Sequence, residues 1–586
     1  MRRIRLAGPA VILLAAAAAT APQLLRGNSC GHDFDFHLVS WLDCLHSWRH
    51  GILYPHWSPS SNYGAGEPRF IFYPPLTWIL GAALGLILPW PLAPIALTFL
   101  LLAATGLATR ALARQAFSDA PATMAGCAAL FSGYSLFTAY ERSAFGELTG
   151  GFWIPLLLLF TLRDRNPSAS LLRRALDGSA VPLALVVAGS WLSNLPLGVM
   201  ASYLLAAVAL AAALLARSWA PVLRASAATV LGMSLAAIYM LPSAWEQRWV
   251  NIQQAASDPG EMIENSWLFA RHADPLLELH DLELRRISMI AAAMIAVALA
   301  GLLLSRLRNT LPAKLCWWFP LALIPQVVLF LQLHISLPVW NLLPKLRFLQ
   351  FPWRWLVVLE APMAIFFASA VWPSQTARRW RRFAVAAVCA VVFLGASAVA
   401  VNLFFQVCDD EDNVLAMASV YRAGTGFQGT GEYSPIGADN SMIAVGLPAA
   451  CLVDDPSTEL GQGAQEDVNP VWSPRQHSCE ATFAAATNLP QHLRIPAVAP
   501  HAGFLILRLR NYPAWQVKVN GQPVAGLPQR DDGLMAVPVP QGAVDLTVDW
   551  TTTPDVLAGR WLSALAVLLL TGLWFLERRL TGPHLS

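Results

Sequence analysis

The sequence has 586 residues, of which 56% are hydrophobic and only 13% are charged, and its mean hydropathy is +0.49. Soluble domains typically carry about 25% charged residues, so this composition excludes an ordinary soluble domain and indicates a protein of the lipid bilayer. The formal net charge of +3 is too small to indicate a nucleic-acid partner. Eight cysteines without C-x-x-C spacing argue against a zinc or thioredoxin-like site.

The N-terminal segment has two interpretations. Arginines at positions 2, 3 and 5 precede an alanine-rich apolar run, which is typical of a signal peptide or of a first membrane helix. Because many apolar stretches follow, we favour an uncleaved first helix. Under either interpretation, residue 27 onward lies outside the cytoplasm.

Apolar stretches recur through the chain, and a helical span needs roughly twenty such residues. The fold class that we expect is mainly α, with residues 1–403 as a transmembrane module and 556–586 as the last span and a cytoplasmic tail. We predict about twelve spans, near residues 8–25, 92–112, 121–139, 148–162, 180–195, 196–216, 221–241, 287–305, 315–333, 353–372, 383–403 and 556–576.

Basic residues decide the orientation of the spans, because cytoplasmic loops carry an excess of lysine and arginine. The apolar stretch 76–88 is too short for a span, and we expect a juxtamembrane helix in the outer interface instead. With this choice both termini and every basic cluster between spans are cytoplasmic. These clusters are Arg110/Arg114, Arg163/Arg165/Arg173/Arg174, Arg217/Arg224, Arg306/Arg308/Lys314, Arg378/Arg379/Arg381/Arg382 and Arg578/Arg579.

The longest outward segment, residues 404–555, is expected to form its own domain. FLILRLR (504–510), WQVKV (515–519) and AVDLTVDW (543–550) alternate as strands do, and Asn520-Gly521 is a hairpin turn signal. This pattern predicts a β-rich, sandwich-like extracytoplasmic domain. Cys451 and Cys479 lie in it, and they either form a disulfide in an oxidising compartment or remain free thiols.

The first outward segment, residues 27–91, carries His32, Asp33, Asp35 and His37 directly after a membrane helix. Ionisable groups at a membrane boundary are costly to desolvate unless they meet a partner, a ligand or water. An aspartate there can accept a proton from a hydroxyl nucleophile or coordinate a divalent cation, and a neighbouring histidine can orient it or contact a phosphate. The alternative is a solvated acidic loop without chemical consequence.

The second outward segment, residues 140–147, is short and holds Glu141, Arg142 and Glu147. Arginine is well suited to bind a phosphate, and Glu147 could face the same cavity as Asp33. The alternative is an Arg–Glu pair that caps the next helix.

Lys345, Arg347 and Arg354 lie at the outer end of a span, against the charge bias of the other loops. This exception indicates an anionic ligand such as a lipid phosphate or pyrophosphate. Interfacial anchoring beside Trp353 and Trp355 is the competing explanation.

These motifs together resemble a known group of bacterial membrane proteins. The first outward segment contains G-H-D-x-x-F-H, G-x-L-Y-P-x-W and G-x-P-x-F-x-F-Y-P-P, which begin at residues 31, 51 and 66. Y-x-R at 140–142 with Glu147, Q-F-P-W-R at 350–354, G-E-Y-x-P at 431–435 and Y-P-x-W at 512–515 agree with the same group. Over nearly its whole length, the chain resembles the GT-C glycosyltransferase superfamily. The nearest members are the YfhO-like proteins and those described as 6-pyruvoyl-tetrahydropterin synthase-related.

Two positions depart from the pattern of that group. Ser193-Asn194 stands where such proteins often carry His-Asn, and Ser143 stands where a glycine follows the arginine. The pterin-synthase description is not followed further, because nothing in the sequence reproduces the three-histidine zinc site of such an enzyme.

The resemblance implies transfer of a sugar from a polyprenyl-phosphate donor to a glycan, lipid or protein acceptor. The reaction would take place at the outer face of the bacterial inner membrane. Asp33 matches the family acid, whereas Asp35 sits where the pattern varies. A divalent cation, magnesium or manganese, remains open as a cofactor, with these two aspartates as its ligands. The implied catalytic residues are Asp33, His37 and Glu147, and the implied substrate-binding residues are His32, Asp35, Arg142, Lys345 and Arg354.

Two other functions remain open. A lipid- or polyprenyl-phosphate-binding transporter would need the basic residues but not Asp33. A non-catalytic component of an envelope-glycan assembly complex would depend chiefly on residues 404–555.

Overall fold

The computed structural model describes residues 7–163, 169–374, 376–462, 470–472, 482–483 and 487–581. In this part of the chain, eight segments are helical, long and apolar enough to cross a membrane. The protein is therefore a mainly helical, polytopic membrane protein. The eight segments are built on α1 (Ala7–Arg26), α5 (Ala93–Ala113), α9 (Gly150–Leu162), α12 (Leu195–Ala216), α15 (Glu278–Leu307), α18 (Leu356–Val371), α19 (Arg379–Phe404) and α21 (Pro554–Thr581).

Two helix pairs pass the same test only together, and both pairs are strongly bent. The segments of α13 (Ala220–Leu235) and α14 (Ala237–Glu246) meet at 71°, and those of α16 (Leu315–Leu331) and α17 (Leu337–Leu342) meet at 99°. Counting each bent pair as one span gives up to 10 spans in the described chain. By this test of length and composition, the described chain has fewer candidate spans than the twelve predicted.

Two predicted spans are interrupted by residues that start new helices. The stretch 121–139 divides into α6 (Asp119–Leu130), α7 (Gly133–Phe137) and a π-helical turn, η4 (Thr138–Arg142). The Ser132 side chain caps α7 by accepting the backbone N–H of Ser135 at 3.0 Å. The stretch 180–195 holds only the 14-residue α11 (Ala180–Ser193), and Asn194 caps α12 directly after it. Hydropathy alone does not register such caps inside an apolar run.

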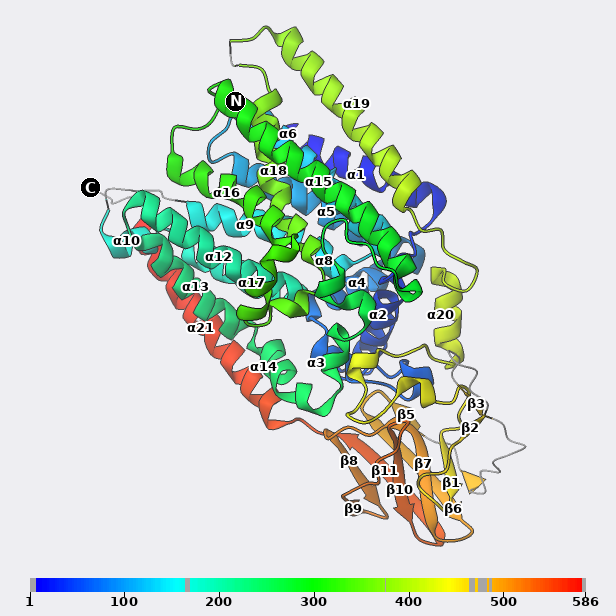
Figure 1. Cartoon of the computed structure of the whole chain (residues 1–586). Helices are drawn as coiled ribbons and strands as arrows, with labels where there is room; N and C mark the ends of the chain where they lie inside the picture. The colour runs from blue at the N-terminus through cyan, green and yellow to red at the C-terminus, as the bar shows by residue number, and fades with distance from the viewer. Residues whose placement is uncertain are drawn as a thin grey trace.

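The short apolar stretch at 76–88 forms α4 (Pro75–Ile87), whose 13 residues are too few for a span, as predicted. It follows α2 (Phe34–Arg49) and α3 (Arg69–Phe72) and packs against α2. In Figure 1, α2 and α3 lie between the helical bundle and the β-rich region. Three further short helices are α8 (Phe145–Leu148), α10 (Leu171–Ala175) and α20 (Val414–Ala423).

The region after α20 is β-rich, and its strand pairs are antiparallel. One sheet has the order β1-β7-β10, a larger sheet has the order β4-β6-β11-β8-β9 with β5 beside β6, and β2 pairs with β3. The strands are β1 (Ala450–Val453), β2 (Gly461–Gln462), β3 (Val471–Trp472), β4 (Thr482–Phe483), β5 (Thr487–Leu489), β6 (His492–Ala499), β7 (Gly503–Arg510), β8 (Trp515–Val519), β9 (Gln522–Val524), β10 (Leu534–Val539) and β11 (Gly542–Trp550).

The three strands expected from alternation are present as β7, β8 and β11. Asn520 and Gly521 turn the chain from β8 into β9 with φ values of 51° and 78°, the left-handed region that such turns require. Cys479 lies outside the described residues, so its pairing with Cys451 stays a prediction.

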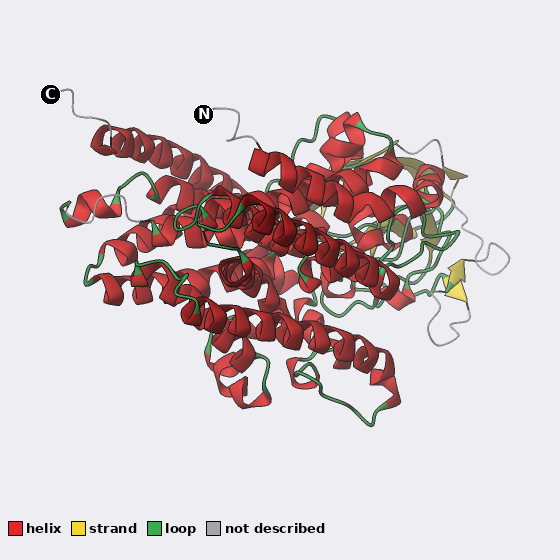
Figure 2. Cartoon of the chain, turned by 90° about the horizontal axis from the view of Figure 1, so that it is seen from above, coloured by secondary structure: helices red, strands yellow, loops and turns green. Residues whose placement is uncertain are grey.

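Large side chains couple the first outward segment to the β-rich region. Trp57 is buried among Tyr512, Trp515 and Trp550, with ring centroids 5.3–6.0 Å apart. Tyr512 also donates a hydrogen bond to the buried carboxylate of Glu246 at 2.5 Å. Figure 2 shows the strands at one end of the molecule and most of the helical bundle extending away from them.

A disulfide that the sequence analysis did not predict joins Cys30 to Cys408, which are 378 positions apart. Cys30 lies in the first outward segment, and Cys408 follows α19. The backbone N–H of Cys30 also donates to the carbonyl oxygen of Gln406 at 3.0 Å. The two segments are therefore held side by side where both leave the helical bundle.

Candidate functional site

The first and second outward segments meet through their backbones. Asp33 N–H donates to the carbonyl oxygen of Arg142 at 2.9 Å, and His32 N–H donates to that of Glu141 at 3.4 Å. Gly31 makes this approach possible, because a Cβ at residue 31 would lie 2.3 Å from the Glu141 carbonyl oxygen. The glycine of the G-H-D motif is thus explained by close contact between two loops.

Ser143 replaces the expected glycine and keeps the backbone conformation that a glycine would favour, with φ of 50° and ψ of 32°. Its hydroxyl accepts the Gly31 N–H at 3.2 Å and donates to the Ser29 carbonyl oxygen at 2.7 Å. These two hydrogen bonds offset the strain of a left-handed serine, so the departure from the family pattern leaves the loop contact intact.

Arg142 ends the π-helical turn η4 and is buried. One guanidinium nitrogen lies 3.7 Å from a carboxylate oxygen of Asp33, whose side chain is 38% exposed. The Arg142 guanidinium also lies 5.6 Å from the centre of the Phe351 ring. Its Nε has no hydrogen-bond partner among the described residues.

Arg354 reaches the same place from η12 (Pro352–Trp355). Its Nε lies 3.6 Å from a carboxylate oxygen of Glu147, and its guanidinium lies 5.0 Å from the centre of the Phe351 ring. Nη1 donates to the Leu349 carbonyl oxygen and to Gln350 Oε1, each at 2.8 Å. Like that of Arg142, the Arg354 Nε has no hydrogen-bond partner in the described chain.

Glu147 is held from behind by Tyr134, whose hydroxyl donates a hydrogen bond to Oε1. Both side chains are buried. Glu147 and Asp33 therefore supply two negative charges beside the two arginines, and only Asp33 is substantially exposed to solvent.

His37 lies one helical turn into α2 and is almost completely buried. Its ring packs against Phe145, Tyr73 and Trp41, with ring centroids 5.1, 5.7 and 6.3 Å away. Burial lowers its pKa to about 4, although the negative charge of Asp33 opposes this shift. At neutral pH the imidazole is therefore uncharged. It can donate or accept a hydrogen bond, but it cannot neutralise the negative charge of a phosphate.

The other predicted site residues do not join this group. His32 and Asp35 are exposed, and the Asp35 carboxylate accepts the Phe36 backbone N–H at 2.6 Å. Lys345 is exposed and lies over the Phe348 ring, and Arg347 pairs with Glu264 at 2.5 Å. Of the basic cluster at 345–354, only Arg354 contacts the site.

A divalent cation does not fit the residues proposed for it. Asp33 faces Arg142, and Asp35 turns toward the start of its own helix. Within the described ranges, no group of three or more histidine, cysteine, aspartate or glutamate side chains is arranged to hold a metal ion.

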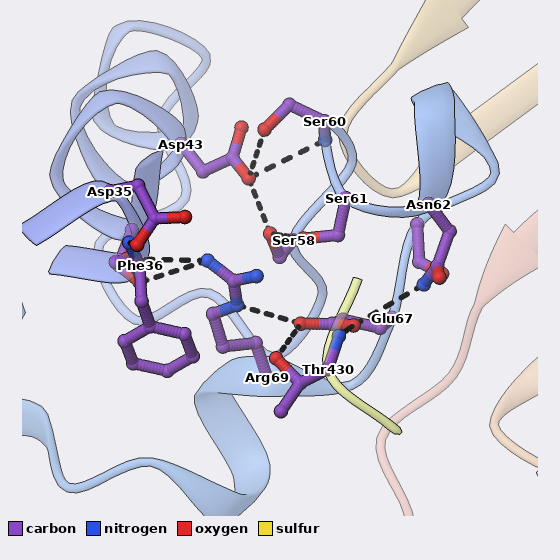
Figure 3. Close-up of polar contacts among 12 residues, drawn as sticks. Asp35, Phe36, Asp43, Ser58, Ser60, Ser61, Asn62, Glu67, Arg69 and Thr430 are labelled. Carbon is purple, nitrogen blue, oxygen red and sulfur yellow. Dashed lines mark hydrogen bonds and ion pairs between the residues drawn. The ribbon is translucent and has the colours of Figure 1, made fainter. Parts of the chain in front are cut away.

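A second polar network, which the sequence analysis missed, fixes the first outward segment to the chain after α20. Figure 3 shows Asp43 accepting hydrogen bonds from Ser58 and Ser60, at 2.5 and 2.9 Å from the hydroxyls. Beside it, Glu67 accepts from Arg69 Nε at 2.7 Å and from the Thr430 backbone N–H at 2.8 Å. Two charged residues inside the otherwise apolar motif at 66–75 were the available signal.

Glu360 was also missed, although it is an isolated acid in the middle of a predicted span. It is buried in α18 and accepts the hydroxyls of Ser132 and Ser135, each at 2.6 Å. These serines explain how a carboxyl group is accommodated there.

The spans, the β-rich region and the buried charges between them define a polytopic membrane protein with a polar site beside its helical bundle. A model of a membrane-protein family described as "6-pyruvoyl-tetrahydropterin synthase related domain" matches residues 70–407. Because this match covers more than half of the sequence, the chain belongs to that family. A search of curated proteins finds no significant match.

Solved structures of two GT-C glycosyltransferases are similar to this chain. One is the archaeal oligosaccharyltransferase AglB from Archaeoglobus fulgidus, solved with an inhibitory peptide and a dolichol-phosphate. It has 12% sequence identity to this chain and a TM-score of 0.41, and the match covers 73% of this chain and 61% of AglB. Arabinofuranosyltransferase AftD from Mycobacteria has 12% identity and a TM-score of 0.42 over 95% of this chain and 60% of its own. The chain thus spans about three fifths of the length of either structure.

Proposed function

We propose that this protein is a membrane glycosyltransferase that transfers a sugar from a polyprenyl-phosphate donor to an envelope acceptor at the outer face of the membrane. The observation that carries the proposal is the pair Arg142 and Arg354. Both guanidinium groups are buried over Phe351, and each has an Nε without a hydrogen-bond partner in the described chain. A buried donor without a full hydrogen bond is costly, and the carboxylate contacts of these arginines, at 3.6 and 3.7 Å, are longer than hydrogen bonds. The pair is therefore suited to a ligand that brings anionic oxygens.

In the proposed reaction, Asp33 accepts the proton of the acceptor hydroxyl. The acceptor oxygen forms a bond to the anomeric carbon while the bond from that carbon to the phosphate oxygen breaks. The departing electron pair stays on the phosphate, where Arg142 and Arg354 stabilise the developing charge. Glu147 holds Arg354, and the buried His37, whose backbone N–H donates to the Asp33 carbonyl oxygen at 3.1 Å, helps to position Asp33.

Binding of the phosphate group is the first point to test. The purified protein in lipid nanodiscs is incubated with a polyprenyl phosphate or with the matched polyprenol, and the retained lipid is quantified by mass spectrometry. We expect preferential retention of the phosphate form. Arg142→Gln and Arg354→Gln should each weaken it at least about tenfold, because each removes charge-assisted hydrogen bonds to the phosphate.

Arg347→Gln is the matched control, because Arg347 is an exposed arginine of the same loop that pairs with Glu264. It should leave the preference unchanged. Equal retention of phosphate and alcohol by the wild-type protein, or an equal loss in Arg347→Gln, would show that the buried pair is not a phosphate site.

A function in binding or transport without bond breakage is the second candidate, and one observation favours it. The Asp33 carboxylate already faces Arg142 at 3.7 Å, so an ion pair accounts for its position without a catalytic role. Under this alternative, Asp33→Asn has no effect on the handling of a polyprenyl-phosphate sugar. Under the proposed reaction, it abolishes turnover of that donor.

A further inference from the structure

The ring of Phe351 lies within 6 Å of both buried arginines of the proposed phosphate site. Arg142 approaches it from η4 to 5.6 Å and Arg354 from η12 to 5.0 Å, measured from the guanidinium carbon to the ring centre. One aromatic side chain is thus the shared neighbour of two cations from segments more than two hundred residues apart in sequence.

The backbone around Phe351 fixes the direction of its ring. Gln350 adopts φ of 61° and ψ of −50°, an unusual conformation for a non-glycine residue, and Pro352 follows. A residue before proline is restricted to extended conformations, and Phe351 has φ of −119° and ψ of 122°. Trp353 then stacks on the ring at 4.3 Å with the planes 10° apart. The ring is therefore a rigid part of the loop.

Two guanidinium groups in a buried site repel each other, and their side chains are long and flexible. The face of an aromatic ring carries negative charge density, which attracts a cation within about 6 Å of its centre. A single rigid ring in contact with both arginines therefore attracts each of them and limits their positions, beside the carboxylates of Asp33 and Glu147 that oppose their charge.

We propose that Phe351 is a positioning residue that holds Arg142 and Arg354 at the spacing required to bind one phosphate group between them. This inference rests on the proposed function for its ligand but not for the arrangement of the arginines. Phe351 itself contacts no reacting atom in this account. Its ring fixes the positions of the Arg142 and Arg354 guanidinium groups before the donor binds.

The test compares Phe351→Leu, which removes the aromatic face, with Phe351→Tyr, which keeps it. The control is Phe393→Leu, which removes a ring packed against Phe131 and Phe367 in the spans. Retention of a polyprenyl phosphate should fall about tenfold in Phe351→Leu and stay near the wild-type value in the other two variants. Retention of the matched polyprenol should be unchanged in all three. Equal loss in Phe351→Leu and Phe351→Tyr, or no loss in Phe351→Leu, would overturn the inference.

A second measurement does not depend on any lipid ligand. Phenylglyoxal modifies accessible arginines, and peptide mass spectrometry reports the extent of modification at Arg142 and Arg354. We expect faster modification of both in Phe351→Leu, and the wild-type rate in Phe351→Tyr and Phe393→Leu. If the wild-type protein fails to distinguish polyprenyl phosphate from polyprenol, the proposed function fails, and the arginine modification still decides the role of Phe351. Unchanged modification rates in Phe351→Leu would contradict that role.

Discussion

Asp33 and Arg142 are joined twice, because the backbone N–H of Asp33 donates to the Arg142 carbonyl oxygen at 2.9 Å and their side chains face each other at 3.7 Å. The first contact fixes where the two outward segments meet. The second brings the Asp33 carboxylate, which is more exposed than that of Glu147, next to a buried guanidinium. Any change that separates the two segments should therefore weaken the site even when both charged residues are kept.

Ser143 offers a test of this loop contact. Ser143→Ala keeps the left-handed backbone and loses both hydroxyl hydrogen bonds, so we expect a loss of stability of about 2 kcal/mol. Ser143→Gly loses the same bonds but relieves the backbone strain, so its loss should be smaller by about 1 kcal/mol. Apparent melting temperatures in detergent compare the two variants. A glycine variant less stable than the alanine variant would contradict the strain assigned to the positive φ, and an alanine variant as stable as the wild type would contradict the role given to the hydroxyl.

Tyr134→Phe tests whether Glu147 is oriented from behind. Without the tyrosine hydroxyl, Glu147 Oε1 loses its donor and the carboxylate is free to turn away from Arg354. We expect several-fold weaker retention of a polyprenyl phosphate, because the position of Arg354 is no longer fixed. Tyr203→Phe is the control, since the Tyr203 hydroxyl donates to the Pro344 carbonyl oxygen at a more exposed position. Equal retention in both variants would exclude a positioning role for Tyr134.

The burial of His37 predicts a dependence of stability on pH. Burial lowers its pKa from 6.5 to about 4 in the folded protein. As the pH falls, His37 therefore takes up a proton near pH 6.5 in the unfolded chain but only near pH 4 in the folded protein. Stability should fall across this window as the pH drops, by up to about 3 kcal/mol.

The variant His37→Gln isolates the contribution of His37. Its melting temperature should fall less between pH 6.5 and pH 4 than that of the wild-type protein. His50→Gln, at an exposed histidine near the end of α2, should keep the wild-type slope. Other groups act in the opposite sense: burial raises the pKa of Glu432 from 4.5 to about 7, so its contribution is lost as the pH rises. An unchanged slope in His37→Gln would show that the histidine is not buried as described.

The disulfide between Cys30 and Cys408 predicts sensitivity to reduction. It closes a loop of 378 positions, and removing such a crosslink typically costs about 2–5 kcal/mol. Dithiothreitol should lower the apparent melting temperature of the wild-type protein by more than that of Cys30→Ser, whose value is already lowered. Cys316→Ser, at a free cysteine, should behave as the wild type does. If dithiothreitol leaves the wild-type melting temperature unchanged, the disulfide does not form or does not stabilise the protein.

Part of the fold and of the site could be predicted from the sequence because it follows from local patterns. Hydropathy placed α1, α12 and α19 within a few residues, and alternation placed β7, β8 and β11. The charged residues Asp33, Arg142, Glu147 and Arg354 were recognised because charge is costly at a membrane boundary. The structure brings these four side chains into one group.

The remainder depends on contacts between distant segments, which no local pattern encodes. The caps at Ser132 and Asn194 break apolar runs that hydropathy reads as continuous, so neither run forms a single helix long enough to count as a span by itself. The disulfide partner of Cys30 lies 378 positions away in the sequence. The sequence also does not show that Lys345 is exposed whereas Arg354, in the same loop, is buried. No local pattern distinguishes Phe351 from the neighbouring aromatic residues, because its role depends on contacts with two arginines from different segments.

The most direct test of the proposed function is donor turnover by Asp33→Asn. The wild-type protein and this variant are reconstituted with a panel of polyprenyl-phosphate sugars and a membrane extract as the source of acceptor, and released polyprenyl phosphate is measured. Both proteins are first checked for equal retention of polyprenyl phosphate. We expect the wild-type protein to release polyprenyl phosphate from at least one donor and Asp33→Asn to release none. Release by Asp33→Asn at the wild-type rate would contradict the assignment of Asp33 as the base.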